Sequence, residues 1–306
     1  MPYIESIGKS NVLTATQLLD EIRRSNDRWW GHGASESNWV FRGVGDADNW
    51  KQLPSAWRPR SINKLNALIT KIEQHKPPLA TYSSSSDPHE IWVSAETEAI
   101  YQFSQLAAKL GHTIDPCNWS PLRDGRTVSR HNPPGTTPNI ATAPLAQHHG
   151  IPTRLLDWTE DPLFAAFFAV SPQFRAKSAK RIAVWACNIS TMSKLTFVKA
   201  NGCRPFKTHR QASYKNQYLR AQQGLFIETC MAESYFDEKG NWPAMEDYCD
   251  PAIVHEPKQP FLIEFVLHAA EYSSLLELLN REGVNHAALM PSLDTVAATV
   301  VDRWQF

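Results

Sequence analysis

The sequence offers little that could cross-link the chain or bind a metal. Its five cysteines are scattered and form neither a CxxC pair nor a cysteine–histidine cluster. Because disulfide frameworks and zinc sites use paired or closely spaced ligands, we predict neither of them, and no other metal site. Scattered thiols fit a reducing compartment, so we expect a cytoplasmic protein.

Net charge and long apolar runs are also missing. Lysine plus arginine and aspartate plus glutamate both total 31, so the formal charge is zero and no global field draws the chain to nucleic acid. The longest apolar run, Leu163 to Val170, is far shorter than a membrane span, and the first residues do not resemble a signal peptide. We therefore expect no membrane partner, and any nucleic-acid binding must be local.

The composition that remains is that of a folded globular protein. Hydrophobic residues make up 42% of the 306 residues and charged residues 20%. We expect a single domain over residues 1–306, with loop-rich insertions near 79–90 and 112–139, where Ser, Pro, Thr, Gly and Asn gather. The predicted fold class is α+β, with a mixed central sheet and flanking helices.

Hydrophobic periodicity and capping residues predict the elements of this fold. We expect helices from Thr14 to about Ser25, from Ser61 to Lys76, and at 96–110, 144–149, 162–170 and 274–281. We expect strands at 39–41, 153–157, 182–187, 225–230, 261–267 and 287–290. The helix at 162–170 is apolar on every face, so it should be buried.

Two predicted strand ends carry polar side chains that could meet. Arg42 follows one strand, and Asp157 to Glu160 join another strand to the buried helix, whose N-cap should be Asp161. Helix starts favour anions and a guanidinium fits a phosphate, so the two ends could form one phosphate cradle. Equally, Asp161 could only cap the helix, and Arg42 could only pair with Asp157 or Asp46.

His149 and Arg154 lie just before this join. Adjacent histidines on a helix diverge by about 100° and seldom share a metal, so we expect His149, beside Gly150, to contact a ligand or act as acid or base. The alternative for it is a favourable interaction with a helix C-terminus. Arg154 could be a second phosphate ligand, or it could form an ion pair with Asp157 or Glu160.

Two long strings resemble a known family. NWVFRGVGDADNWKQLPSAWRP and PLAQHHGIPTRLLDWTEDPLFAAFFAV are similar to motifs of the bacterial FRG domain family, named for Phe-Arg-Gly. The later strings RAQQGLF and ALMPSLD also resemble its motifs, so the resemblance runs from about Ser6 to Ala298. The chain departs from the family at Glu160 and Asp161, where an uncharged residue followed by Asn is expected.

FRG domains in turn look like distant relatives of ADP-ribosyltransferases, which implies a split-sheet core and NAD as co-substrate, without a metal. The resemblance implies catalytic roles for Arg42, Asp157, Thr159 and Gln223, and to these we add His149 from its place beside Gly150. Arg42 would also bind the NAD phosphates and Gly43 the carboxamide; the rest of the implied NAD-binding set is Phe41, Arg154, Trp158 and Gln222. Where such enzymes usually have Glu, this chain has Gln222 or Gln223, and Asp157, Glu160 or Glu228 could substitute.

The activity implied is an NAD-dependent mono-ADP-ribosyltransferase of toxin or phage-defence type that modifies a DNA or RNA base or a protein. An antitoxin or immunity protein would be a natural partner. The missing glutamate motivates an alternative, a non-catalytic module that binds a nucleotide or nucleic acid. A third hypothesis is hydrolysis of a phosphodiester by the aspartate and histidine set.

Overall fold

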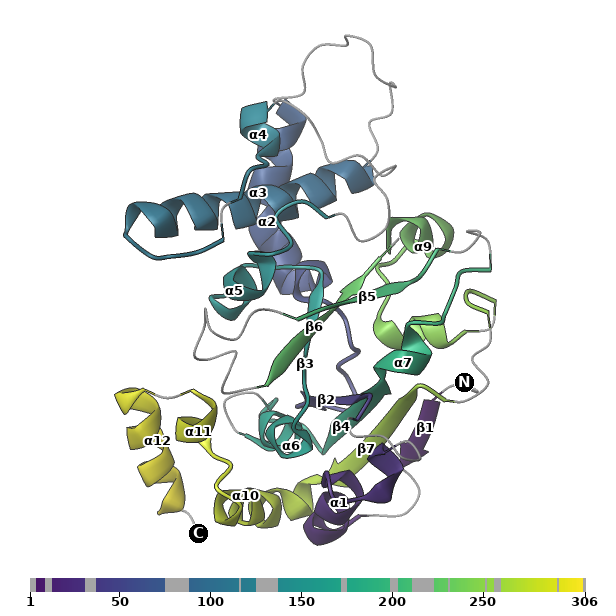
Figure 1. Cartoon of the computed structure of the whole chain (residues 1–306), viewed down its shortest axis with the longest axis vertical. Helices are drawn as coiled ribbons and strands as arrows, with labels where there is room; N and C mark the ends of the chain where they lie inside the picture. Colours follow the sequence, from purple (N-terminus) through teal and green to yellow (C-terminus); the bar gives the residue numbers. More distant parts are fainter. Residues whose placement is uncertain are drawn as a thin grey trace. The chain divides into compact units, whose positions relative to one another are not determined.

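The chain divides into two compact units, each assembled from separate stretches of sequence (Figure 1). The sheet unit comprises residues 1–52, 157–227 and 245–306, and the helical unit comprises residues 53–156 and 228–244. The computed structural model describes residues 4–8, 13–30, 37–74, 88–115, 117–124, 137–171, 175–198, 203–210, 223–230, 232–250, 252–255, 260–290 and 292–304.

A mixed, seven-stranded sheet runs in the order β1-β7-β4-β2-β3-β6-β5. β1 pairs parallel with β7, whereas β7 with β4, β4 with β2, and β2 with β3 pair antiparallel. The strands are β1 Ile4–Ile7, β2 Trp39–Val44, β3 Leu155–Thr159, β4 Arg181–Asn188, β5 Phe206–His209, β6 Gly224–Thr229 and β7 Leu262–His268. The predicted α+β class with a mixed sheet is therefore confirmed.

Helices occur in both units. Those of the sheet unit are α1 Ala15–Ile22, α6 Pro162–Val170, α7 Ile189–Met192, α10 Tyr272–Arg281, α11 His286–Leu289 and α12 Leu293–Arg303. Those of the helical unit are α2 Pro59–Gln74, α3 Pro88–Lys109, α4 Pro121–Asp124, α5 Ala143–His148 and α9 Ala232–Lys239. Short 3-10 turns lie at Asp27–Trp29, Ser55–Trp57, Met245–Cys249 and Ala269–Glu271.

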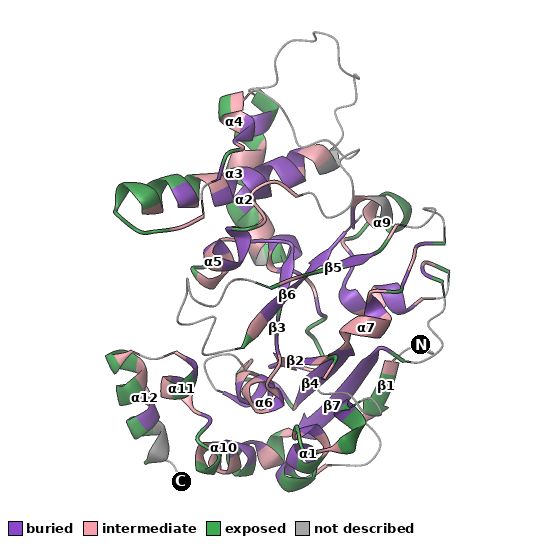
Figure 2. Cartoon of the chain, in the orientation of Figure 1, coloured by how far each residue is buried: buried purple, intermediate pink, exposed green. Residues whose placement is uncertain are grey.

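The core of the sheet unit lies where α1, α6 and α10 cover β2, β4 and β7. Figure 2 shows β4 and β7 buried along nearly their whole length. As predicted, Asp161 caps α6: its carboxylate accepts hydrogen bonds from the N–H groups of Leu163 (2.8 Å) and Phe164 (3.4 Å). Pro162 occupies the first turn, where no backbone donor is needed. These residues fix where α6 begins beside the end of β3.

The Phe-Arg-Gly string is explained by the packing of β2 against α6. Side chains alternate along a strand, so Phe41 and Gly43 face one side and Arg42 the other. Phe41 is 1% exposed and packs edge-on against Trp29, with ring centroids 4.9 Å apart. A Cβ on Gly43 would lie 2.1 Å from the carbonyl oxygen of Ala165 in α6. Only glycine lets the two backbones approach this closely.

Several sequence predictions need correction. The predicted strand at 287–290 is wrong: these residues lie in and just after α11, which the Asn285 side chain caps by accepting from the Ala288 N–H at 3.1 Å. β3 starts two residues later than expected, because the Thr153 N–H and carbonyl are bonded to Ser55 and Ala56 instead. The sequence patterns did not predict β1, β5, α9 and α12.

The two predicted loop regions are only partly described. Residues 79–87 lie outside the described residues, and 88–90 belong to α3, which begins eight residues earlier than expected. Within 112–139, residues 116 and 125–136 also lie outside the description, and Pro121–Asp124 form α4. Gly150 has φ +87°, as expected for a residue just past a helix end.

Gly43→Ala should destabilise the protein strongly. The new Cβ would also lie 2.6 Å from the backbone nitrogen of Ala169, and backbone atoms cannot move aside as a side chain can. Overpacking typically lowers the free energy of unfolding by about 1–3 kcal/mol, and we expect a decrease at or above the top of this range. The measurement is the urea midpoint, which should fall.

Gly111→Ala is the matched control. Gly111 has φ +85° but nothing within 4 Å of a Cβ, so this variant reports backbone strain alone, about 1 kcal/mol. Equal urea midpoints for the two variants would contradict the packing role of Gly43.

Candidate functional site

Arg42 reaches from β2 to the last residues of β3. Its Nη1 donates to the Asp157 carbonyl at 2.6 Å and to Asp157 Oδ1 at 2.7 Å. The other partner that the sequence offered, Asp46, accepts hydrogen bonds from Asn49 and from the backbone of its own turn. Arg42 therefore takes the first of its two predicted partners.

β2 and β3 are paired at one residue pair, Phe41 with Thr159. The stretch of the two strands beyond this pair carries no further residue pair, and we call it the opening. There the guanidinium of Arg42 bonds the Asp157 carbonyl. The Arg42 side chain is 11% exposed and that of Asp157 is 66% exposed, so an almost buried cation meets a carboxylate open to solvent.

One donor of Arg42 is not used. Its Nε is buried and has no hydrogen-bond partner among the described residues. A buried donor without a partner costs about 1–3 kcal/mol, so a group that supplied an acceptor here would gain binding energy. The site thus holds a fixed positive charge with spare hydrogen-bonding capacity.

The turn after β3 brings a third stretch of sequence to the same place. Thr159 Oγ1 accepts a hydrogen bond from the Asp161 N–H at 3.0 Å, which shapes the turn into α6. The Glu160 N–H donates to the Gln223 carbonyl at 3.1 Å. Gln223 has φ +46°, a left-handed conformation uncommon for a residue other than glycine. Arg42 of β2, Asp157 and Thr159 of β3, and Gln223 just before β6 are therefore brought into one region of the sheet unit.

Three further residues of the predicted NAD-binding set have structural roles. Phe41 is in the core and Gly43 is covered by α6 on its Cβ side. Trp158 is 3% exposed, and its Nε1 is buried without a hydrogen-bond partner in the described part of the chain. Gln222 lies outside the described residues. Contacts of these four residues with NAD stay predictions.

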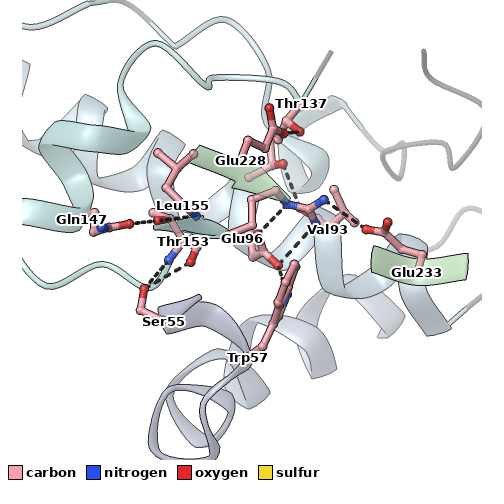
Figure 3. A network of polar contacts seen from close by, with 12 residues as sticks. Ser55, Trp57, Val93, Glu96, Thr137, Gln147, Thr153, Leu155, Glu228 and Glu233 are labelled. Atoms are coloured by element: carbon pink, nitrogen blue, oxygen red, sulfur yellow. Dashed lines mark hydrogen bonds and ion pairs between the residues drawn. The ribbon is translucent and has the colours of Figure 1, made fainter. Parts of the chain in front are cut away.

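Arg154 lies in the helical unit and is bonded to two carboxylates, those of Glu96 and Glu233, which Figure 3 labels. Its Nε donates to Glu96 Oε2 at 3.0 Å and its Nη1 to Glu233 Oε1 at 3.1 Å. Its ion-pair partners are therefore Glu96 and Glu233, and not Asp157 or Glu160 as the sequence suggested. Burial alone would lower the pKa of Arg154, but the charges of Glu96 and Glu233 outweigh it and raise the pKa.

Aromatic rings complete this buried cluster. The Trp57 Nε1 donates to Glu96 Oε1 at 3.3 Å, and the Trp57 ring stacks on Trp242 with centroids 5.0 Å apart. The guanidinium carbon of Arg154 lies 5.9 Å from the Trp57 ring centroid. Because the Arg154 guanidinium meets carboxylates and a ring, this arginine organises the core of the helical unit. A role in binding NAD phosphate stays a prediction.

One family model matches part of this sequence. Residues 37–178 match the model of the FRG domain. This segment contains Arg42, Asp157 and Thr159, and also His149 and Arg154, whereas Gln223 lies beyond it. No curated protein and no solved structure matches the chain. The match supports the FRG resemblance of the two long strings.

His149, inside the FRG segment, lies at the end of α5 in the helical unit. Its exposed ring stacks on Phe103, with centroids 5.9 Å apart. Burial lowers the pKa of the neighbouring His148, and the proximity of His149 lowers it further. The catalytic role of His149 stays a prediction, since it and Arg42 belong to different units.

The described residues contain no cluster suited to a metal ion. Within them, no group of three or more His, Cys, Asp or Glu side chains could hold one. None of the helices described is long and apolar enough to cross a membrane. Glu96 and Glu233 could not be singled out from the sequence, because two glutamates 137 positions apart give no sign that they share one arginine.

Arg154→Ala should destabilise the helical unit, because it leaves Glu96 buried without its cation. Breaking a buried ion pair from one side costs about 3–5 kcal/mol. The measurement is the urea midpoint of unfolding, monitored by tryptophan fluorescence.

The control is Arg181→Ala, which removes a surface arginine that is 33% exposed and paired with Asp48. Such a pair contributes at most about 1 kcal/mol. If Arg154→Ala unfolded at the same urea concentration as Arg181→Ala, the buried cluster would not organise the unit.

Proposed function

We propose that this protein is an NAD-dependent mono-ADP-ribosyltransferase. One observation carries the proposal: three stretches far apart in sequence are joined in one region of the sheet unit. Phe41 pairs with Thr159 beside Arg42, and the Glu160 N–H is bonded to the Gln223 carbonyl. These are the three positions, in the same chain order, that the resemblance to ADP-ribosyltransferases implies.

The opening between β2 and β3 supports a split-sheet core. Successive residues of an antiparallel strand direct their backbone N–H and C=O to opposite neighbours. Beyond Phe41, either Arg42 or Gly43 therefore directs its backbone N–H and C=O toward β3. The described residues of β3 supply no ladder partner for them there. Such a backbone edge offers one donor and one acceptor, the pair that an amide such as the nicotinamide carboxamide requires.

The state of Arg42 supports a phosphate role. A pyrophosphate could replace the exposed Asp157 carboxylate, neutralise the guanidinium and supply an acceptor to its buried Nε. Because Asp157 also holds Arg42 through its main-chain carbonyl, the guanidinium would keep its orientation during this exchange.

The reaction requires that the chain position NAD and the acceptor and stabilise the charge that develops on the ribose. The bond between C1′ of the ribose and the nicotinamide nitrogen breaks, and its electron pair leaves with the neutral nicotinamide. A heteroatom of a nucleic-acid base or a protein side chain then donates a lone pair to the oxocarbenium-like C1′ and loses a proton. A site that holds the pyrophosphate still and stabilises the positive ribose would promote both events.

Arg42→Ala should abolish most of the NAD turnover. We expect a fall of about 10²–10³-fold in nicotinamide release, since one charged group aimed at the reacting substrate is lost. The assay incubates the protein with labelled NAD and with DNA, RNA or protein, and detects the transferred ADP-ribose by mass spectrometry.

Arg181→Ala, an arginine variant on the neighbouring strand β4, should retain full turnover. Wild-type protein that neither cleaves NAD nor modifies any of the three acceptors would overturn the proposed activity.

A second candidate is a non-catalytic module that binds a nucleotide or nucleic acid in the same place. It is favoured by Gln223, which stands where a glutamate is expected and cannot ionise. Tight NAD binding by wild-type protein, lost in Arg42→Ala and accompanied by no turnover, would select this function.

A further inference from the structure

The proposed transferase lacks an obvious negative charge for its substrate. Positive charge develops on the ribose as the glycosidic bond breaks, and enzymes that cleave such bonds place a carboxylate beside it. Gln223 can donate and accept hydrogen bonds but carries no charge. The choice of a carboxylate to fill this gap rests on the proposed function.

Two of the three available carboxylates differ from Glu160 in their placement. Asp157 Oδ1 lies 2.7 Å from the Arg42 guanidinium, so its charge lies at the phosphate-binding group and would repel a bound phosphate. Glu228 is 1% exposed and accepts a hydrogen bond from the Thr137 hydroxyl. Glu160 is the carboxylate whose own main chain is bonded to Gln223.

Glu160 is differently placed. Its main chain is bonded to Gln223, and its side chain is 31% exposed. Its carboxylate forms an ion pair with Arg210, which directly follows β5 and is 61% exposed. β6 lies between β3 and β5 in the sheet.

The strand order determines where this ion pair runs. Neighbouring strands are about 4.8 Å apart, so an ion pair between residues at the ends of β3 and β5 spans about 10 Å. The strand between them is β6, the residue before it is Gln223, and the Glu160 N–H is bonded to the Gln223 carbonyl. The Glu160 carboxylate is thus held beside the position where the negative charge is missing.

We propose that Glu160 is the catalytic carboxylate of this site and that Arg210 is its positioning residue. Glu160 stabilises the oxocarbenium-like ribose as the bond to nicotinamide breaks. It then accepts the proton that the attacking heteroatom of the acceptor loses, and releases that proton to solvent. The left-handed backbone of Gln223, at φ +46°, is retained because the Glu160 N–H fixes its carbonyl.

The test is Glu160→Gln, which keeps the size of the side chain and removes its charge. We expect nicotinamide release at saturating NAD to fall about 10²–10³-fold, with NAD affinity unchanged, because the charge acts on the transition state and not on the bound substrate. NAD affinity is measured by calorimetry on the full chain. Glu160→Asp should retain more activity than Glu160→Gln.

Glu282→Gln is the matched control. Glu282 is also in the sheet unit, is 37% exposed and pairs with Arg23 at 2.6 Å. This variant should keep wild-type turnover and wild-type affinity for NAD.

Arg210 is tested separately. Arg210→Ala should lower the turnover number without lowering NAD affinity, and Arg210→Lys should restore part of the turnover because it can still pair with Glu160. If Arg210 had only a structural role, both variants would have a lower urea midpoint, and turnover and NAD affinity would fall together.

The outcomes separate the two proposals. If wild-type protein turns over NAD and Glu160→Gln does so equally well, the role of Glu160 is overturned, whereas the proposed transferase activity stands. Equal losses of affinity and turnover in Glu160→Gln also overturn it, since the residue would then only bind substrate. Absence of turnover in wild-type protein overturns the transferase, and with it the assignment of Glu160.

Discussion

The arrangement of the site depends on the point where β2 and β3 stop pairing. After the single pair of Phe41 with Thr159, no further residue pair joins the strands, and the Arg42 guanidinium bonds the Asp157 carbonyl instead. An arginine side chain can span this opening because its donors lie at the end of a long stem. Its fixed orientation follows from two acceptors that belong to one residue. The turn into α6 and the start of β6 are then built around this opening.

Arg42 and Arg154 are both largely buried, but they differ in how easily a ligand could take the place of their present partners. Arg154 donates to two carboxylates and lies against an indole ring, so a phosphate would have to displace charges that are themselves buried. Arg42 faces one exposed carboxylate and keeps a donor without a partner among the described residues. Desolvation explains the difference: a buried carboxylate cannot leave its cation cheaply, whereas an exposed one returns to water. Of the two, Arg42 is the arginine suited to bind an anion.

Local signals in the sequence were enough to predict the elements that position the site. The strand at Phe41, the Asp161 cap, Pro162 and the apolar helix α6 all follow from patterns within a few residues. The strand is longer than predicted, because β2 continues to Val44 through pairing with β4 and Arg42 lies within it. The contact of Glu160 with Gln223 and the enclosure of Arg154 by Glu96 and Glu233 depend on pairing between distant segments, which one sequence does not display. The helix α11 was mistaken for a strand because four apolar residues have no period of their own, and the Asn285 cap decided the outcome.

The packing of Gly43 changes how the Phe-Arg-Gly string should be used. Phe41 is buried in the core, and Gly43 allows the close approach of α6, so two of the three residues serve the packing of β2 against α6. Sequences that keep these two residues need only preserve that junction, whatever their chemistry. A search for sequences that share the proposed site should therefore weigh Arg42, together with Asp157 and Thr159 on β3, above the string as a whole.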